Sequence, residues 1–170
     1  MISVYFALYL LLIIIQRITE MKISKRNEKI LIQKGAIEFG KPHFKFIIML
    51  HSLFFISLLI EYSLKANSIR LSLYNIILFS FVAILQALRV STIKSLGIYW
   101  TTRIYRVPGE PLIKTGLYKY LKHPIYIIVI LEFIIIPLVF NLYLTSIIFT
   151  LLNLITITVR ITEENKALNT

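Results

Sequence analysis

The sequence of 170 residues contains no cysteine and only five glycines. The absence of cysteine excludes disulfides, thiolate metal sites and cysteine nucleophiles. The sequence also lacks a glycine-rich nucleotide loop, an HExxH zinc motif and a serine-elbow motif. Soluble Rossmann enzymes, zinc proteases and P-loop enzymes are therefore not indicated, and no metal site is expected.

Apolar residues are what the chain has in excess. They make up 58% of the sequence, whereas charged residues make up 16%. Soluble domains average about 45–50% apolar and about 25% charged residues. The composition therefore predicts a protein whose solvent is lipid, and the length allows a single domain.

The net charge of +11 raises the question of a nucleic-acid partner. The basic residues, however, lie in segments between apolar runs, which is typical of membrane topology. No nucleic-acid partner is expected. The first apolar run has no preceding Lys or Arg and no small-residue cleavage site, so it is interpreted as a retained helix and not as a secretory signal.

Charges delimit three apolar runs, Ile2 to Gln16, Phe46 to Ile60 and Leu71 to Leu88. Each is near the lower limit for a membrane span, and flanking Lys and Arg side chains can extend it by snorkelling. The segment from Pro124 to Val159 is longer and has one charge, Glu132.

This last segment is too long for one span. Its 36 residues would form a helix of about 54 Å, whereas the hydrocarbon core is about 30 Å thick. It must therefore fold back, and Pro137 with Asn141 marks the expected turn. The predicted fold is an all-α integral membrane protein of about five transmembrane helices with a C-terminal hairpin.

The distribution of basic residues predicts the topology. Residues 17–45 hold eight Lys and Arg, and residues 89–123 hold seven, whereas residues 61–70 hold two and the hairpin turn holds none. The positive-inside rule then places the two heavily basic segments and the C-terminus in the cytoplasm and the N-terminus outside. Within the first basic segment, a short amphipathic helix is expected from Met21 to Lys34, ended by Gly35.

The expected organisation is one domain over residues 1–170, with N-terminal helices in 1–90 and the loop, hairpin and tail in 91–170. The longest polar stretch, Lys94 to His123, contains Pro-Gly and Thr-Gly turn signals. His123 followed by Pro124 places an imidazole at the membrane surface, with the proline in the first helical turn. By themselves these residues favour an interfacial loop with Tyr and His anchors over a catalytic site.

A second polar group closes the last apolar run. In a continuing helix, Arg160, Glu163 and Glu164 share a face at i, i+3 and i+4. The cation and the two carboxylates can bind a zwitterionic ligand, or they can form a solvated helix end with an internal ion pair. Spacing alone favours the second alternative.

Three further ionisable residues lie within or beside the apolar runs: His51, Glu61 and Glu132. Ionisable groups at membrane depth are costly and often functional. Glu132 is the strongest candidate because it lies about two turns inside its helix. His51 is expected to bond a neighbouring helix, and Glu61 is expected only to mark the interface.

From about Ser95 to Leu168 the chain resembles the isoprenylcysteine carboxyl methyltransferase family. The motifs that carry the resemblance occur in order and in register with the hairpin. They are Leu96-Gly97 with Trp100, Leu112-Ile113, Gly116-Leu117-Tyr118, Lys122-His123-Pro124-Ile125-Tyr126, and Arg160 with Glu163-Glu164. The sequence departs from the pattern at Lys122, where Arg is usual, and at Glu110, where His is frequent.

The resemblance implies a cofactor, S-adenosylmethionine, held between the loop and the last two helices. The residues implied to line its site are Pro111, Leu112, Ile113, Tyr118, His123, Pro124, Ile125, Tyr126 and Glu164. Arg160 would face an anionic substrate, and Arg160 and Glu164 would be the catalytic pair. The segment Gly35 to Gly40, with His43 and His51, is similar to a bacterial subgroup associated with O-methylation of alkylpyrones.

The function that follows is methylation of a lipidic carboxylate or acidic hydroxyl whose tail enters from the bilayer. Such an oxygen is already ionised, so the protein would supply alignment and exclusion of water. Two alternatives remain. One is a lipid amine N-methyltransferase, against which Arg160 argues, and the other is a non-enzymatic multi-pass accessory protein.

Overall fold

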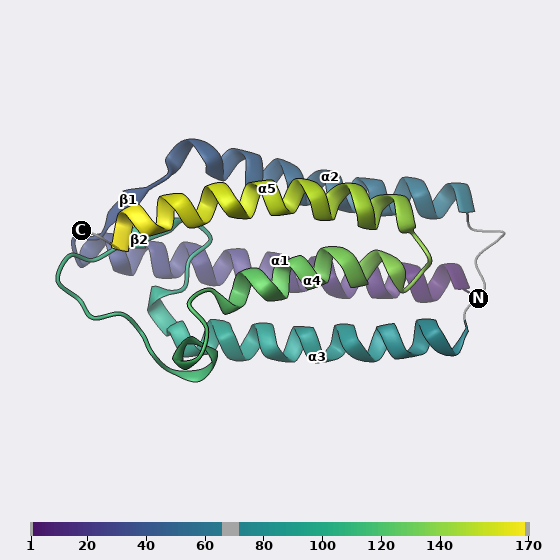
Figure 1. Cartoon of the computed structure of the whole chain (residues 1–170), viewed down its shortest axis with the longest axis horizontal. Helices are drawn as coiled ribbons and strands as arrows, with labels where there is room; N and C mark the ends of the chain where they lie inside the picture. The colour runs from purple at the N-terminus through teal and green to yellow at the C-terminus, as the bar shows by residue number, and fades with distance from the viewer. Residues whose placement is uncertain (1, 66–71, 169–170) are drawn as a thin grey trace.

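The computed structural model describes residues 2–65 and 72–168 and contains five long helices (Figure 1). They are α1 (Ile2–Gln33), α2 (Lys41–Lys65), α3 (Leu73–Leu96), α4 (Pro124–Leu138) and α5 (Tyr143–Leu168). Four of them are long and apolar enough to cross a membrane, and α4, with 15 residues, is shorter. The prediction of an all-α membrane protein with a C-terminal hairpin is confirmed. Arg70, counted above in a weakly basic segment, lies outside the described residues.

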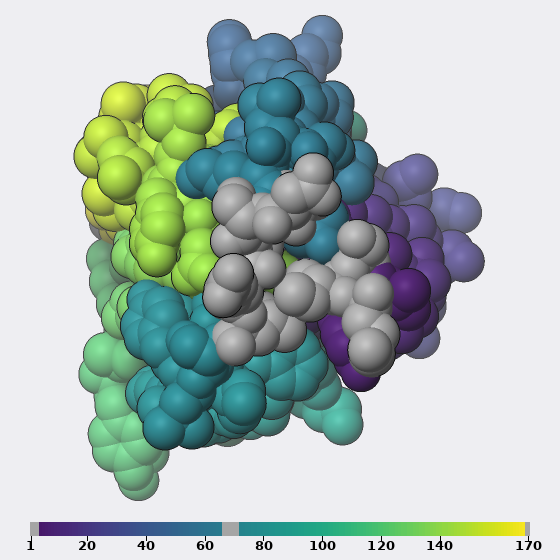
Figure 2. Space-filling view, turned by 90° about the vertical axis from the view of Figure 1, so that its right-hand side faces the viewer, coloured from purple at the N-terminus to yellow at the C-terminus, as the bar shows by residue number. Residues whose placement is uncertain are grey.

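The helices run along a common long axis, and α4 packs between α3 and α5 (Figure 1). Viewed end-on, α1 (purple), α2 (blue), α3 (teal) and α5 (yellow-green) lie at different corners of the bundle (Figure 2). We call one end the loop end: it comprises residues 34–40, residues 97–123 and the last turn of α5. The start of α1 and the α4–α5 turn lie at the opposite end.

Two short strands lie at the loop end. Strand β1 (Ile37–Phe39) pairs antiparallel with β2 (Ile104–Arg106), with Glu38 opposite Tyr105. Three residues are too few for an alternating pattern to be recognised in a sequence, and neither strand was predicted. Their pairing joins the end of α1 to the segment that follows α3.

Helix α1 corrects the prediction for residues 17–45. The expected loop, with a separate helix from Met21 to Lys34, does not exist, because α1 continues without a break to Gln33. It ends where expected, since Gly35 has a φ of 80°, the left-handed conformation common after helices. Arg17 does not end the apolar helix because its charge is paired inside the bundle.

The α4–α5 hairpin turns at the predicted residues. Helix α4 ends just after Pro137, and Asn141 has a φ of 57°. Glu61 of α2 accepts hydrogen bonds from the backbone N–H groups of Leu144 (3.2 Å) and Thr145 (2.7 Å) at the start of α5. A carboxylate there pairs with otherwise unbonded N–H groups and with the positive end of the helix dipole. Glu61 therefore positions α5, and the expectation that it only marks the interface is wrong.

Glu132 joins three helices in the middle of the bundle. Its side chain is 1% exposed. It accepts hydrogen bonds from Arg17 of α1 (2.7 Å), Arg89 of α3 (3.0 Å) and Gln86 of α3 (3.0 Å). Arg17 and Arg89, expected to flank the spans, thus lie at the depth of a buried glutamate.

Glu20 completes this group, which we call the charge network: Arg17, Glu20, Arg89 and Glu132. Arg89 binds both carboxylate oxygens of Glu20, at 2.6 Å and 2.7 Å, and Arg17 binds one of them at 3.0 Å. Two positive and two negative groups balance, so none is left uncompensated away from water. The bidentate geometry adds direction to the attraction.

We predict that Glu132→Gln destabilises the protein. The substitution leaves two buried guanidinium groups with one carboxylate, and breaking a buried pair in this way costs about 3–5 kcal/mol. Thermal unfolding in detergent measures the change. Glu110→Gln, which breaks the partly exposed pair with Lys34, is the control and should change stability by less than about 1 kcal/mol. Equal unfolding temperatures for both variants would contradict the prediction.

Candidate functional site

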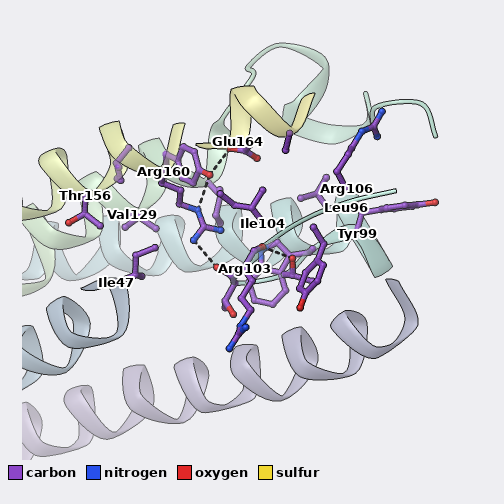
Figure 3. A pocket seen from close by; sticks show the side chains of 18 of the residues that line it. Ile47, Leu96, Tyr99, Arg103, Ile104, Arg106, Val129, Thr156, Arg160 and Glu164 are labelled. Carbon is purple, nitrogen blue, oxygen red and sulfur yellow. Dashed lines mark hydrogen bonds between the residues drawn. The ribbon is translucent and has the colours of Figure 1, made fainter. Parts of the chain in front are cut away.

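A cavity of about 210 Å³ opens at the loop end, where α2, α4 and α5 meet the segment from Leu96 to Arg106 (Figure 3). Both the bundle helices and the loop segment contribute apolar and polar residues to its walls. The lining includes His51, Arg89, Trp100, Thr102, Tyr118, Ile125, Tyr126, Asn153, Arg160 and Glu164.

One face of α5 forms the longest wall of the cavity. Asn153, Ile157, Arg160, Glu164 and Leu168 all line it, and their spacing of three or four residues places them on the same side of the helix. Helix α5 continues through Arg160 and Glu164, which is the condition for their shared face. The wall is thus uncharged at depth and charged near the loop end.

Tyr126 connects the two charged residues of this wall. Its hydroxyl donates to Glu164 Oε2 at 2.6 Å and accepts from Arg160 Nε at 2.9 Å. Arg160 reaches across the cavity, where its Nη1 donates to the carbonyl of Thr102 at 2.7 Å (Figure 3). Among the described residues the Nη2 group of Arg160 has no hydrogen-bond partner. One N–H edge of the guanidinium therefore remains available to a ligand.

His123 precedes the first turn of α4 and contacts the carboxylate of Glu164. Its Nδ1 lies 3.2 Å from Glu164 Oε2, and its ring stacks on that of Tyr126. A carboxylate only accepts, so Nδ1 carries a proton. The Nε2 atom is buried and has no partner among the described residues. Pro124 occupies the first helical turn, as predicted.

Tyr118 adds a neutral polar group to the cavity. It lies in the short helix η2 (Gly116–Lys119). Burial raises the pKa of its phenol, and the nearby Glu164 carboxylate raises it further. The phenol therefore stays protonated at neutral pH and can donate a hydrogen bond to a ligand.

The structure brings together some of the expected site residues and not others. Tyr118, Ile125, Tyr126, Arg160 and Glu164 line the cavity. His123 and Pro124 are not among the lining residues, but His123 contacts the lining residues Glu164 and Tyr126. Pro111, Leu112 and Ile113 do not line the cavity, and Leu112 is 51% exposed. Their segment is held to α1 instead, through Glu110 and Lys34 at 3.2 Å.

Two expectations drawn from spacing are wrong. Glu163 pairs with Lys166 and not with Arg160, and Arg160 and Glu164 line the cavity instead of forming a solvated helix end. His51 Nδ1 bonds the carbonyl of Ile47 in its own helix at 2.9 Å, and not a neighbouring helix. The edge of its ring lies against Phe133 of α4, with ring centroids 5.1 Å apart.

Sequence inspection missed several lining residues. Thr102 contributes a backbone carbonyl, Asn153 lies deep in α5, and Arg89 had been assigned to a loop. Every residue has a backbone carbonyl, so the residue type at position 102 does not indicate this hydrogen bond. Asn153 carried a signal, since it is an amide within an apolar run, but one polar residue in a helix does not show which face is buried.

Comparisons with known proteins identify relatives. A profile of the isoprenylcysteine carboxyl methyltransferase family matches residues 76–170, which contain most of the cavity lining. An uncharacterized protein of Bacillus subtilis, YpbQ, is 42% identical over 96% of both chains. An uncharacterized protein of Haemophilus influenzae is 30% identical over 90% of this chain and 88% of its own. No solved structure matches significantly.

We predict that Tyr126→Phe lowers stability by about 1–3 kcal/mol, because Arg160 Nε and Glu164 each lose a hydrogen-bond partner in a largely buried position. Thermal unfolding in detergent tests this. Tyr120→Phe is the matched control, since the Tyr120 side chain is 77% exposed and its loss of a hydroxyl should have little effect. A Tyr126→Phe variant as stable as Tyr120→Phe would show that the bridging hydroxyl is dispensable.

Proposed function

The chain belongs to the isoprenylcysteine carboxyl methyltransferase family, and from this premise we propose that it transfers a methyl group from S-adenosylmethionine to an oxygen of a lipidic acceptor. The observation that carries the proposal is the group formed by Arg160, Tyr126, Glu164 and His123 at the loop end of a membrane-embedded cavity. An ordered cation and an ordered carboxylate face the same space.

The residues present suit a sulfonium cofactor. S-adenosylmethionine supplies an activated methyl group on a positively charged sulfur. In this proposal Glu164 binds the ammonium or ribose of the cofactor, with His123 and Tyr126 holding its carboxylate. The ring of Tyr118 offers an aromatic face of the kind that attracts cations.

Arg160 is the proposed site for the acceptor anion. Tyr126 and Thr102 hold its guanidinium, and its remaining N–H groups are free to orient a carboxylate or an enolate. Such an oxygen is ionised at neutral pH, so no strong general base is required. The bound cofactor would supply its methyl group to this oxygen and would leave as a neutral thioether. The protein contributes alignment and a site without bulk water.

The proposed acceptor class is a lipidic carboxylate or acidic hydroxyl, and an alkylpyrone is the favoured example. The resemblance of residues 35–51 to an alkylpyrone-methylating subgroup supports this choice. The apolar walls from α2, α4 and α5 suit a tail that enters sideways from the bilayer. Arg160 disfavours a cationic amine as the acceptor.

We predict that the purified protein binds S-adenosylhomocysteine in the micromolar range, measured by calorimetry in detergent. Glu164→Ala and His123→Ala should each weaken binding by at least about tenfold, because a charged hydrogen bond is lost or a carboxylate is no longer held in place. Glu163→Ala is the matched control, since Glu163 adjoins Glu164 but pairs with Lys166 outside the cavity.

The outcomes separate the proposal from its rival. A folded wild-type protein that binds no S-adenosylhomocysteine would favour a non-enzymatic accessory protein, in which the loop end is only a docking surface. Equal losses of S-adenosylhomocysteine affinity in Glu163→Ala and Glu164→Ala would contradict the assignment of Glu164 to cofactor binding.

We further propose that the loop end faces the cytoplasm and the start of α1 faces outside, because the heavily basic segments gather at the loop end. The chain has no cysteine, so a single introduced thiol reports one position. An impermeant maleimide added to intact cells should label Leu73→Cys at the start of α3. It should label Lys114→Cys only after permeabilisation. The reverse pattern would invert the topology.

A further inference from the structure

Asn153 is a buried amide without a hydrogen bond. It lies on the cavity face of α5 and is 1% exposed. Its Nδ2 atom is buried and has no hydrogen-bond partner among the described residues. The side chain therefore lies at the deep part of the cavity with its donor group unpaired.

Some buried polar side chains of the bundle are paired, whereas the Thr150 and Tyr62 hydroxyls, like the Asn153 amide, have no partner among the described residues. Thr145 bonds Ser57, Ser146 bonds the carbonyl of Ile134, and Glu132 has three donors. An unpaired amide in an apolar bundle opposes folding, and native proteins rarely keep one without a reason. A ligand that enters the cavity would supply the missing partner.

The register of α2 against α5 places His51 at the level of Asn153. The two helices run antiparallel, with Glu61 bonded to Leu144 and Thr145 and with Phe54 in ring contact with Phe149. The same register, continued for about one more turn, brings His51 beside Asn153. Both residues line the same cavity.

His51 has a defined tautomer. The carbonyl of Ile47 only accepts, so Nδ1 of His51 carries the hydrogen in the 2.9 Å bond between them. In the neutral ring Nε2 is then an acceptor, and it has no partner among the described residues. Arg89 also lines this part of the cavity, but Glu20 and Glu132 bind its N–H groups. The groups left to bind a ligand in this part of the cavity are therefore the Asn153 amide and the Nε2 acceptor of His51.

We propose that Asn153 and His51 form a subsite for a second oxygen of the lipidic acceptor, a hydroxyl or a carbonyl located within its apolar part. This inference rests on the proposed function and adds a specificity determinant to it. A hydroxyl accepts from the Asn153 amide and donates to His51 Nε2, whereas a carbonyl uses the amide alone. Asn153 precedes Arg160 by seven residues, so the two oxygens of the acceptor lie about 10 Å apart along the helix axis.

This arrangement selects against plain hydrocarbon tails. A site built to hydrogen-bond an oxygen leaves its own polar groups unpaired when an analogue without that oxygen binds. The preferred acceptor is therefore an oxygenated lipid, anionic at one end and polar again in its middle.

The test uses palmitic acid and two series of its derivatives, in which a hydroxyl or a keto group is moved stepwise along the chain. Affinities are measured by competition with a fluorescent fatty acid, with and without S-adenosylhomocysteine, in the full-length protein in detergent. We expect one position of the oxygen to bind about tenfold more tightly than palmitic acid, as one good hydrogen bond allows.

Three variants test which residues cause the preference for an oxygenated chain. Asn153→Leu should abolish the preference in both series without lowering the unfolding temperature, because it removes an unpaired buried amide. His51→Phe should reduce the preference for the hydroxyl and keep that for the ketone. Thr158→Val is the matched control, because Thr158 lies on the exposed face of α5 and bonds only the carbonyl of Leu154.

The results distinguish this inference from the proposed function. No preference in the wild type, or an unchanged preference in Asn153→Leu, would overturn the subsite and show that the amide holds water only. A lower unfolding temperature of Asn153→Leu with an unchanged preference would show a purely structural role. An Asn153-dependent preference without any S-adenosylhomocysteine binding would retain the subsite and reject the methyltransferase.

Discussion

The balanced pairing of Arg17, Glu20, Arg89 and Glu132 is the interaction on which the arrangement of the bundle depends. In lipid, apolar helix faces gain little by meeting each other, so packing and polar contacts decide which helices associate. The charge network gives α1, α3 and α4 one common arrangement in which every charge is compensated. Arg89 also lines the cavity, so the network that orders the helices shapes the site as well.

Helix α5 carries the site because other elements hold it at both ends. Glu61 binds its first N–H groups, and Tyr126 and Thr102 hold Arg160 near its last turns. Its cavity face changes from an amide at depth to a charged pair at the loop end. A single helix face can therefore bind a lipid along its length and present the polar end of that lipid to a cofactor. This arrangement explains why the proposed chemistry is housed in a membrane protein.

Much of the site was predictable because local chemistry marked it. His123 with Pro124, and Arg160 with Glu164, are unusual residues at the ends of apolar runs, and the family motif placed them in register. The structure unites them through Tyr126, a contact between α4 and α5 that spacing along one helix does not reveal. Pro111, Leu112 and Ile113 belong to the same motif but lie away from the cavity, since a motif records order along the chain and not which side chains face a common space.

The sequence by itself determined the membrane setting, the number of long helices and the turn near Asn141, because hydropathy, run length and turn-forming residues act locally. Only the tertiary structure decided that Arg17 and Arg89 lie within helices, that α1 continues to Gln33, and that Asn153 faces a cavity. The physical reason is that the cost of a buried charge or amide depends on its partners. Those partners come from residues far apart in the chain, and only folding brings them together.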